Sequence, residues 1–128
     1  MNILVVDDSK IQQHLVSKIL FELGYKNIAC CSSAEEAMAY LGSNEVDLIL
    51  SDWHMGGATG FDLLNQVRNH HWLKNTPFIM VTNEHEKANI LKAAKLGLQN
   101  YMFKPLNKDI LRNKLIELSK SHDLQPPV

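Results

Sequence analysis

The chain has 128 residues, the size of one domain, and its 45% hydrophobic and 21% charged content is ordinary for a globular protein. A formal net charge of -1 at pH 7 gives no overall attraction to nucleic acid or to a membrane surface. The apolar runs are short, and the N-terminus lacks a basic start with a long apolar stretch. Neither membrane insertion nor a signal peptide is therefore predicted.

Cys30 and Cys31 are the only cysteines and are adjacent, which is poor geometry for a structural disulfide. We expect two core thiols in a reduced, cytoplasmic protein. The six histidines are dispersed along the chain. They are expected to be solvated rather than to form a zinc site.

The first part of the chain alternates between strand and helix patterns. Residues 2–6 are apolar and β-branched, which predicts a buried strand. Helical spacing then predicts one apolar face, made of Ile11, Leu15, Ile19 and Leu23. Gly24 is a natural stop for this helix. Residues 28–31 predict a second, short strand.

The next helix is predicted to begin after Ser33, which has capping-box spacing with Glu36, and to end at Gly42. Residues 48–50 predict a third strand, buried on both faces and followed at once by Asp52. A flexible loop is then predicted from three glycines, Gly56, Gly57 and Gly60. The helix after this loop carries Phe61, Leu64 and Val67.

The second half repeats this alternation. Pro77 introduces a fourth buried strand over residues 78–81, which ends on the hydroxyl of Thr82. Asn83 and Glu86 are candidate caps of the next helix. That helix carries Ile90, Leu91 and Ala94 and ends at Gly97.

Residues 101–103 predict the fifth strand, which ends in Lys104-Pro105. Asn107 is expected to cap the last helix, with Leu106 and Leu111 placed as a hydrophobic staple. The helix carries Ile110, Leu111, Leu115 and Leu118. Residues 1–120 are predicted to form one domain, and residues 121–128 to be a flexible tail or the start of a linker.

Five strands alternating with five helices predict an α/β fold of three layers, with a parallel sheet covered on both faces. The strand ends then bring five polar residues to one edge of the sheet: Asp7, Asp8, Asp52, Thr82 and Lys104. Three crowded carboxylates repel one another and either raise a pKa or recruit a cation, and their oxygens suit Mg2+.

Mg2+ and Lys104 would leave this predicted pocket near neutral, so that a phosphoryl group could approach Asp52. A carboxylate can then act as nucleophile and form an aspartyl phosphate, mainly through positioning and charge neutralisation. Thr82 could donate its hydroxyl to one phosphoryl oxygen, while Lys104 pairs with another.

Over residues 1 to about 120, the sequence resembles the receiver domains of two-component response regulators, and within them the chemotaxis regulators of the CheY type. The similarity lies in Val-Val-Asp-Asp-Ser (residues 5–9), Asp-Leu-Ile-Leu-Ser-Asp-Trp-His-Met (47–55), Val-Thr (81–82) and Tyr-Met-Phe-Lys-Pro (101–105). The resemblance implies a doubly wound sheet of strand order 2-1-3-4-5. It also implies a signalling switch, not an enzyme, that accepts a phosphoryl group from a histidine kinase on Asp52.

The resemblance assigns further roles by position. Asp8 and Asp52 would ligate Mg2+ together with the main-chain carbonyl of His54, and Asp7 would act mostly through water. Thr82 and Tyr101 match the family's switch pair, in which the hydroxyl moves toward the phosphoryl group and the ring turns inward. Lys104 matches the family's lysine, and the Lys104-Pro105 bond would be cis.

The output face would be formed by the fourth helix, fifth strand and fifth helix, where five residues match positions that meet the flagellar motor switch: Lys87, Ile90, Ala94, Tyr101 and Lys114. The chain also departs from the family. Gly56 stands where a proline is usual, and Asn83 where a small residue is usual. His54 and Glu84 occupy positions that tune the lifetime of the phosphorylated state.

Other interpretations remain open at this point. Asp7 and Asp8 alone would suit a helix cap, Trp53 could be a core or surface residue, and Tyr101 an ordinary strand residue. The chain could also be the N-terminal receiver of a longer regulator. An enzyme on the same fold is disfavoured, since a flavin site needs a phosphate-binding loop after the first strand. A phosphatase would carry its nucleophile there.

Overall fold

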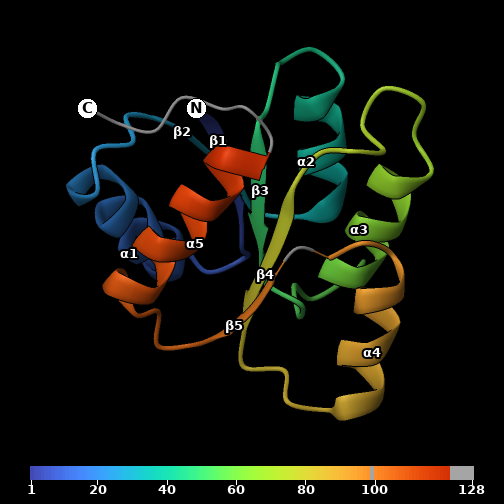
Figure 1. Ribbon diagram of the computed structural model, residues 1–128. Coiled ribbons are helices and arrows are strands. Elements are labelled where there is room, and N and C mark those ends of the chain that lie inside the picture. The colour runs from blue at the N-terminus through green and yellow to red at the C-terminus, as the bar shows by residue number, and fades with distance from the viewer. Residues whose placement is uncertain (99, 122–128) are drawn as a thin grey trace.

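The computed structural model describes residues 1–98 and 100–121, which form a three-layer α/β fold (Figure 1). Within these residues the elements are β1 (Asn2–Val6), α1 (Lys10–Glu22), β2 (Asn27–Cys31), α2 (Ala34–Leu41), β3 (Leu48–Ser51), α3 (Gly60–Arg68), β4 (Phe78–Thr82), α4 (Lys87–Lys95), β5 (Asn100–Phe103) and α5 (Lys108–Ser121). The strands form one parallel sheet in the order β2-β1-β3-β4-β5. The predicted architecture and strand order are confirmed.

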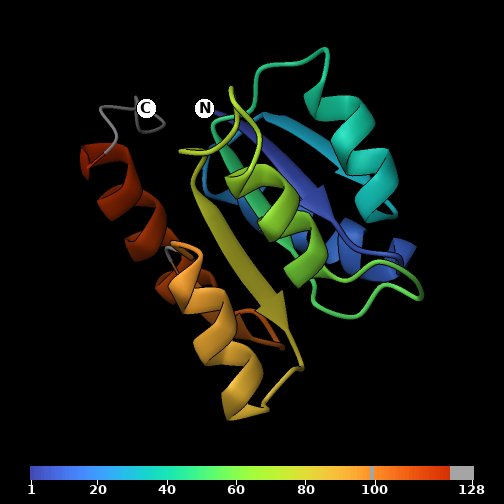
Figure 2. The ribbon, with the colours of Figure 1, turned by 90° about the vertical axis from the view of Figure 1, so that its right-hand side faces the viewer.

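The sheet is covered on both faces, with α1 and α5 on one side and α2, α3 and α4 on the other (Figures 1 and 2). β3 shows why its sequence is a continuous apolar run. Leu48 and Leu50 pack in the same cluster as Leu111 of α5, whereas Ile49 packs with Leu64 of α3. A central strand buried on both faces has no solvent side for polar residues.

The strand register aligns the ends of the strands at one edge. Val6 of β1 pairs with Ser51 of β3, and Thr82 of β4 pairs with Phe103 of β5. The residues that follow these pairs therefore emerge together at the carboxyl edge of the sheet, where ligands bind in open α/β folds.

The predicted apolar face of α1 is wrong in its first half. It was expected to consist of Ile11, Leu15, Ile19 and Leu23, but Ile11 is 73% exposed and Leu15 is 49% exposed. The buried residues are Gln13, Val16 and Leu20. The side of α1 that faces the sheet thus includes a polar residue, which hydrophobic periodicity does not register.

Gln13 faces inward because its amide has partners there. Its Nε2 donates to the main-chain oxygen of Asp7 at 2.6 Å, to that of Cys31 at 3.3 Å and to Ser32 Oγ at 3.1 Å. A buried amide with these partners is satisfied, and it ties α1 to the ends of β1 and β2.

The N-terminal caps of the helices agree only in part with those predicted from the sequence. Ser33 accepts from the Glu36 N–H at 3.0 Å, as predicted. A full reciprocal capping box occurs instead at α3, between Thr59 and Asp62. Gly60, predicted to lie in a flexible loop, is the first residue of α3 and is buried.

The last two helices confirm one predicted cap and contradict another. Asn107 Oδ1 accepts from the Ile110 N–H at 2.9 Å. At α4, Glu86 occupies the cap position, but neither it nor Asn83 caps through its side chain. Ala93, rather than Ala94, is the buried residue of α4, and Leu91 is exposed. Gly97 follows α4 with φ of 74°, consistent with its predicted role as a stop.

Cys31 is buried and Cys30 is exposed, and both are free thiols. The prediction of two core thiols is therefore wrong for Cys30, which lies in the edge strand β2. Helix α5 continues to Ser121, and the rest of the predicted tail, residues 122–128, lies outside the described residues. In the ranges 1–98 and 100–121, no helix has the length and apolarity needed to cross a bilayer.

Candidate functional site

The carboxyl edge of the sheet brings Lys104 between two carboxylates. Its Nζ lies 2.9 Å from Asp7 Oδ2 and 3.0 Å from Asp52 Oδ2. The side chains are shielded from solvent, with exposed fractions of 12% for Lys104, 5% for Asp7 and 12% for Asp52. The structure thus joins three residues that are 45 or more positions apart along the chain, as predicted from their strand ends.

The ammonium of Lys104 stays charged in this setting. Burial opposes the charged form, but hydrogen bonds and the negative charges of Asp7 and Asp52 outweigh it, so the pKa of Lys104 is raised. The Lys104-Pro105 peptide bond is cis. A permanent cation beside Asp52 can pair with a phosphoryl oxygen.

Asp52 is held by its main chain as well as by Lys104. Its N–H donates to the Val6 carbonyl at 3.0 Å, and its carbonyl accepts from Ser51 Oγ at 2.9 Å. The Trp53 N–H donates to Asp52 Oδ1 at 2.6 Å. Trp53 itself is 5% exposed and stacks on Phe61 with a centroid distance of 5.6 Å, so it is a core residue.

Asp8 and Gly56 face each other at the rim of the site. Asp8 is exposed, and its Oδ2 lies 3.7 Å from where a Cβ on Gly56 would be. Gly56 has φ of 73°, whereas proline fixes φ near -65°. The proline that the family resemblance leads one to expect at this position would require a different loop conformation.

The donor set fits Mg2+. Among the described residues, no three His, Cys, Asp or Glu side chains converge in a ready metal cluster. Mg2+ does not need one, because it keeps several waters and takes one or two carboxylates. Asp7, Asp8 and Asp52 supply hard oxygen donors at this edge, and Asp8 is open to solvent.

The predicted switch residues Thr82 and Tyr101 meet at Glu84. Thr82 Oγ1 accepts from the Glu84 N–H at 3.2 Å, and the Tyr101 hydroxyl donates to the Glu84 carbonyl at 2.9 Å. Thr82 is 1% exposed. Burial, then the charges of Glu84 and Asp52, raise the pKa of Tyr101, so its hydroxyl remains a donor.

Glu84 also bridges two loops through its carboxylate. Oε2 lies 2.8 Å from His54 Nε2 in the β3–α3 loop, and Oε1 accepts from the Glu86 N–H at 2.8 Å. The Glu86 N–H, followed by hydrogen bonds from His54 and Asn89, lowers the pKa of Glu84. The two predicted lifetime-tuning residues, His54 and Glu84, are thus in direct contact.

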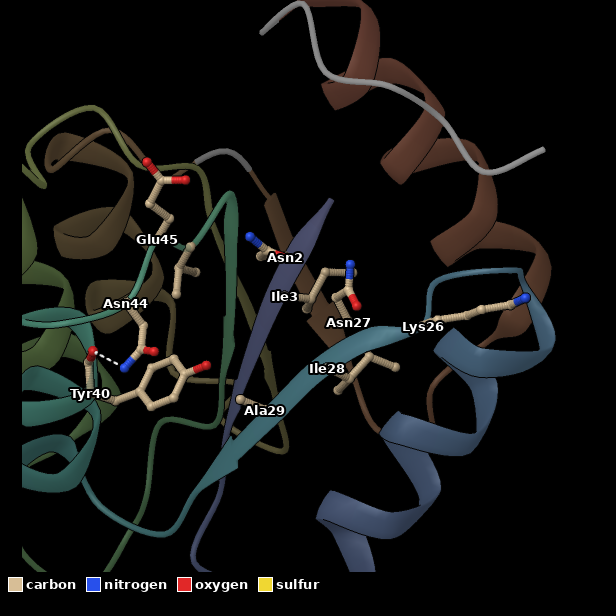
Figure 3. A pocket seen from close by; sticks show the side chains of 10 residues that line it. Asn2, Ile3, Lys26, Asn27, Ile28, Ala29, Tyr40, Asn44 and Glu45 are labelled. Carbon is tan, nitrogen blue, oxygen red and sulfur yellow. Dashed lines mark hydrogen bonds between the residues drawn. The ribbon is translucent and has the colours of Figure 1, made fainter.

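Asn83, the third of these residues, lies at a pocket beside Lys104. It is exposed and lines a pocket of about 420 Å³ between α1 and the β5–α5 connection, together with Leu15 and Lys104. A second pocket, of about 450 Å³, lies at the opposite end of β1 and β2 (Figure 3). None of the predicted site residues lines that second pocket.

The predicted output-face residues come from three neighbouring elements: Lys87, Ile90 and Ala94 from α4, Tyr101 from β5 and Lys114 from α5. Figure 1 shows α4 and α5 on opposite faces of the sheet, one on each side of β5. Lys87 and Ala94 are exposed, whereas the other three are half-buried. An aromatic contact not predicted from sequence adjoins them: His85 stacks on Phe103 at 4.3 Å.

Arg68 has a structural role that was not predicted from the sequence. Its guanidinium donates to the main-chain oxygens of Leu96 at 2.6 Å, Thr76 at 2.7 Å and Gly97 at 2.8 Å. Burial lowers the pKa of Arg68. This side chain fastens the end of α3 to the connections around it. No sequence pattern distinguishes it from a solvated basic residue in a last helical turn.

Comparison with known proteins shows the family of this chain. The profile of the response regulator receiver domain matches residues 3–116. This chain belongs to that family. Receiver domains of two-component response regulators act as signalling switches rather than as ordinary enzymes.

The receiver domain is similar to curated chemotaxis proteins. It is 36% identical to the chemotaxis protein CheY of Pseudomonas aeruginosa over 115 residues, covering 90% of this chain and 93% of that protein. It is 35% identical to CheY1 of Helicobacter pylori over 116 residues, covering 90% and 94%.

Solved structures agree in fold. A two-component response regulator from Clostridium difficile superimposes with a TM-score of 0.87 at 28% identity, covering 96% of this chain and 98% of that one. The chemotaxis response regulator CheY4 of Vibrio cholerae gives 0.81 at 30% identity, covering 91% and 97%.

Proposed function

We propose that this receiver domain is a phosphorylation-controlled switch in which Asp52 accepts a phosphoryl group from the phosphohistidine of a sensor histidine kinase. A carboxylate oxygen of Asp52 would attack phosphorus, and the phosphorus–nitrogen bond to the departing imidazole would break. The observation that carries the proposal is the contact of Lys104 with both Asp52 and Asp7 at a shielded edge of the sheet.

Mg2+ is part of the proposal. Asp8, Asp52 and the main-chain carbonyl of His54 would hold it, with Asp7 acting through water. When bound, it would neutralise charge on the phosphoryl oxygens and orient them. The chain itself supplies the second cation, since Lys104 is already hydrogen-bonded to Asp52.

The switch would pass through Glu84. In the structure Thr82 is engaged with the Glu84 N–H and Tyr101 with the Glu84 carbonyl. A phosphoryl oxygen near Asp52 would accept a hydrogen bond from the Thr82 hydroxyl and draw it away from the Glu84 N–H. This shift of Thr82 would change the contact that the β4–α4 connection makes with Tyr101. A ligand can bias two arrangements in this way only through such differential contacts.

The proposed readout is the face of α4, β5 and α5. Helix α4 contains Lys87, Lys92 and Lys95 and no acidic residue, so this face favours an acidic partner segment. The likeness to curated chemotaxis proteins supports a partner such as the flagellar motor switch. The alternative, a receiver joined to an output domain, uses the same chemistry, and the mass of the native product separates the two.

The lifetime of the phosphorylated state is proposed to depend on His54 and Glu84, whose 2.8 Å contact spans the two loops beside Asp52, and on Asn83 at the neighbouring pocket. Residues 1–120 are retained as the receiver domain. A cytoplasmic setting also remains part of the proposal, because a reducing compartment keeps thiols free, as both cysteines are here.

Intact mass after incubation with Mg2+ and a small phosphodonor tests this function. Wild type should gain one phosphoryl group, and Asp52→Ala should gain none. Asp109→Ala is the matched control, since the Asp109 side chain is 78% exposed on α5, and it should label as wild type does. Labelling of Asp52→Ala would refute the assignment. If wild type is not labelled, a histidine-kinase donor replaces the small one, and failure with both would refute the switch.

A further inference from the structure

Gly60 lies against the main chain of the proposed phosphoryl acceptor. A Cβ built on Gly60 would be 2.1 Å from the main-chain oxygen of Asp52 and 2.9 Å from Met80 Sδ. Real Cβ atoms essentially never approach within 3.0 Å of another heavy atom. A side chain at position 60 would therefore force α3 and the Asp52 main chain apart by about 1 Å.

The surroundings leave little room for that displacement. Met80 is fully buried in β4. Two hydrogen bonds fix the Asp52 main chain. The Asp52 N–H donates to the Val6 carbonyl, and Ser51 Oγ donates to the Asp52 carbonyl. The Gly60 N–H donates to the Trp53 carbonyl at 2.7 Å. The first turn of α3 is thus bonded to the residue that follows Asp52.

The requirement at Gly60 is one of space rather than of backbone conformation. The glycines with positive φ in the described ranges are Gly24, Gly56 and Gly97. Alanine at position 60 would therefore meet no backbone strain of the left-handed kind. Its effect would come from the missing space beside Asp52.

We propose that Gly60 is a positioning residue for phosphoryl transfer. By lacking a side chain, it lets α3 approach the Asp52 carbonyl, and this approach sets where the Asp52 carboxylate lies relative to Lys104 and to the donors of the metal site. The inference rests on the proposed function of Asp52. It adds that a residue eight positions away, with no reactive group, controls the geometry of the acceptor.

Gly57 offers a matched control in the same connection. Nothing lies within 4 Å of a Cβ built on Gly57, and its φ is not in the left-handed region. Gly57→Ala therefore adds the same methyl group and removes the same backbone freedom, but leaves the Asp52 main chain undisturbed.

The test compares wild type, Gly60→Ala and Gly57→Ala with a small phosphodonor across a Mg2+ titration. For Gly60→Ala we expect the rate at saturating Mg2+ to fall by about tenfold to 100-fold, the range expected when a reacting group is misplaced by about 1 Å. The Mg2+ concentration that gives half of the maximal rate should also rise. Gly57→Ala should match wild type in both. A wild-type rate and Mg2+ dependence in folded Gly60→Ala would overturn the inference.

Two further variants separate positioning from loss of stability. Leu118→Ala opens the core at the far end of α5 and should lower the melting temperature without changing the phosphorylation rate of the folded protein. If Gly60→Ala does not fold, Ser51→Ala replaces it, because this change removes the hydroxyl bonded to the same Asp52 carbonyl. It should lower the rate by a smaller factor, and an unchanged rate would overturn the inference. Failure of wild type to label would instead refute the proposed function.

Discussion

Removing the charge of Lys104 is the sharpest test of how the site is held together. At the effective dielectric of a partly buried pair, each contact near 3 Å contributes about 5 kcal/mol of Coulomb energy before desolvation is subtracted. Desolvation offsets much of this, and breaking a buried ion pair costs about 3–5 kcal/mol. Lys104→Met leaves Asp7 and Asp52 facing each other, so we expect the free energy of unfolding to fall by about 3 kcal/mol.

Thermal unfolding at pH 7 with a chelator present measures this loss, and for a domain of this size it amounts to roughly 10 °C in the melting temperature. The control is Lys108→Met, the same substitution in an ion pair with Glu22 at 3.8 Å, where both side chains are nearly half exposed. Such a surface pair contributes at most about 1 kcal/mol. Equal losses in the two variants would refute the reasoning.

The pH dependence gives a second check on the same variant. The folded-state pKa of Lys104 is raised above its usual 10.5. A raised pKa means that its stabilisation is fully present below pH 10.5 and is lost as the pH rises through the folded value. The gap between wild type and Lys104→Met should therefore stay constant from neutral pH to about pH 9.5 and shrink above pH 10.5. A gap that closes below pH 9 would contradict the argument.

Three further predictions concern neighbouring groups. Tyr101→Phe removes the hydroxyl bonded to the Glu84 carbonyl; the free energy of unfolding should fall by about 1 kcal/mol, and amide exchange in the β4–α4 connection should accelerate, whereas unchanged exchange would count against that bond. Burial, then the charge of Glu36, raises the pKa of Cys31 to about 11. Iodoacetamide at pH 8 should therefore modify exposed Cys30 alone. Equal labelling of Cys30 and Cys31 in the folded protein would contradict this. Asp8→Asn removes an exposed carboxylate from an acidic edge of the sheet. The melting temperature should rise by about 1–3 °C, while Mg2+-dependent phosphorylation falls. A lower melting temperature would contradict this prediction.

Sequence patterns predicted the α/β fold class and the gathering of Asp7, Asp52 and Lys104 at one edge of the sheet, both of which the structure shows. The β-branched and fully apolar runs predicted the strands, because a parallel strand covered on both faces has no polar side. Asp7, Asp52 and Lys104 could be placed together from their positions after strands, since parallel strands end at one edge. The family resemblance supplied the strand order and the expected roles of Thr82 and Tyr101.

Periodicity failed where a polar side chain found partners inside. On α1 it favoured Ile11 and Leu15 over Gln13, but only the folded structure provides Gln13 with the carbonyls of Asp7 and Cys31. At α4, Glu86 has the residue type and place of a weak cap, yet its side chain does not cap. Local sequence patterns do not show whether a polar side chain will form a hydrogen bond within its own element or with another element after packing.

The sequence by itself determined the elements of this protein and the edge at which its charged residues gather, because both follow from apolar periodicity and from polar residues at strand ends. The tertiary structure alone decided the distances within the site. It also decided that His54 meets Glu84, that Gln13 turns inward, and that Gly60 must leave space for the Asp52 carbonyl. These features depend on how separate elements pack against one another, and the sequence of a single element does not specify that packing.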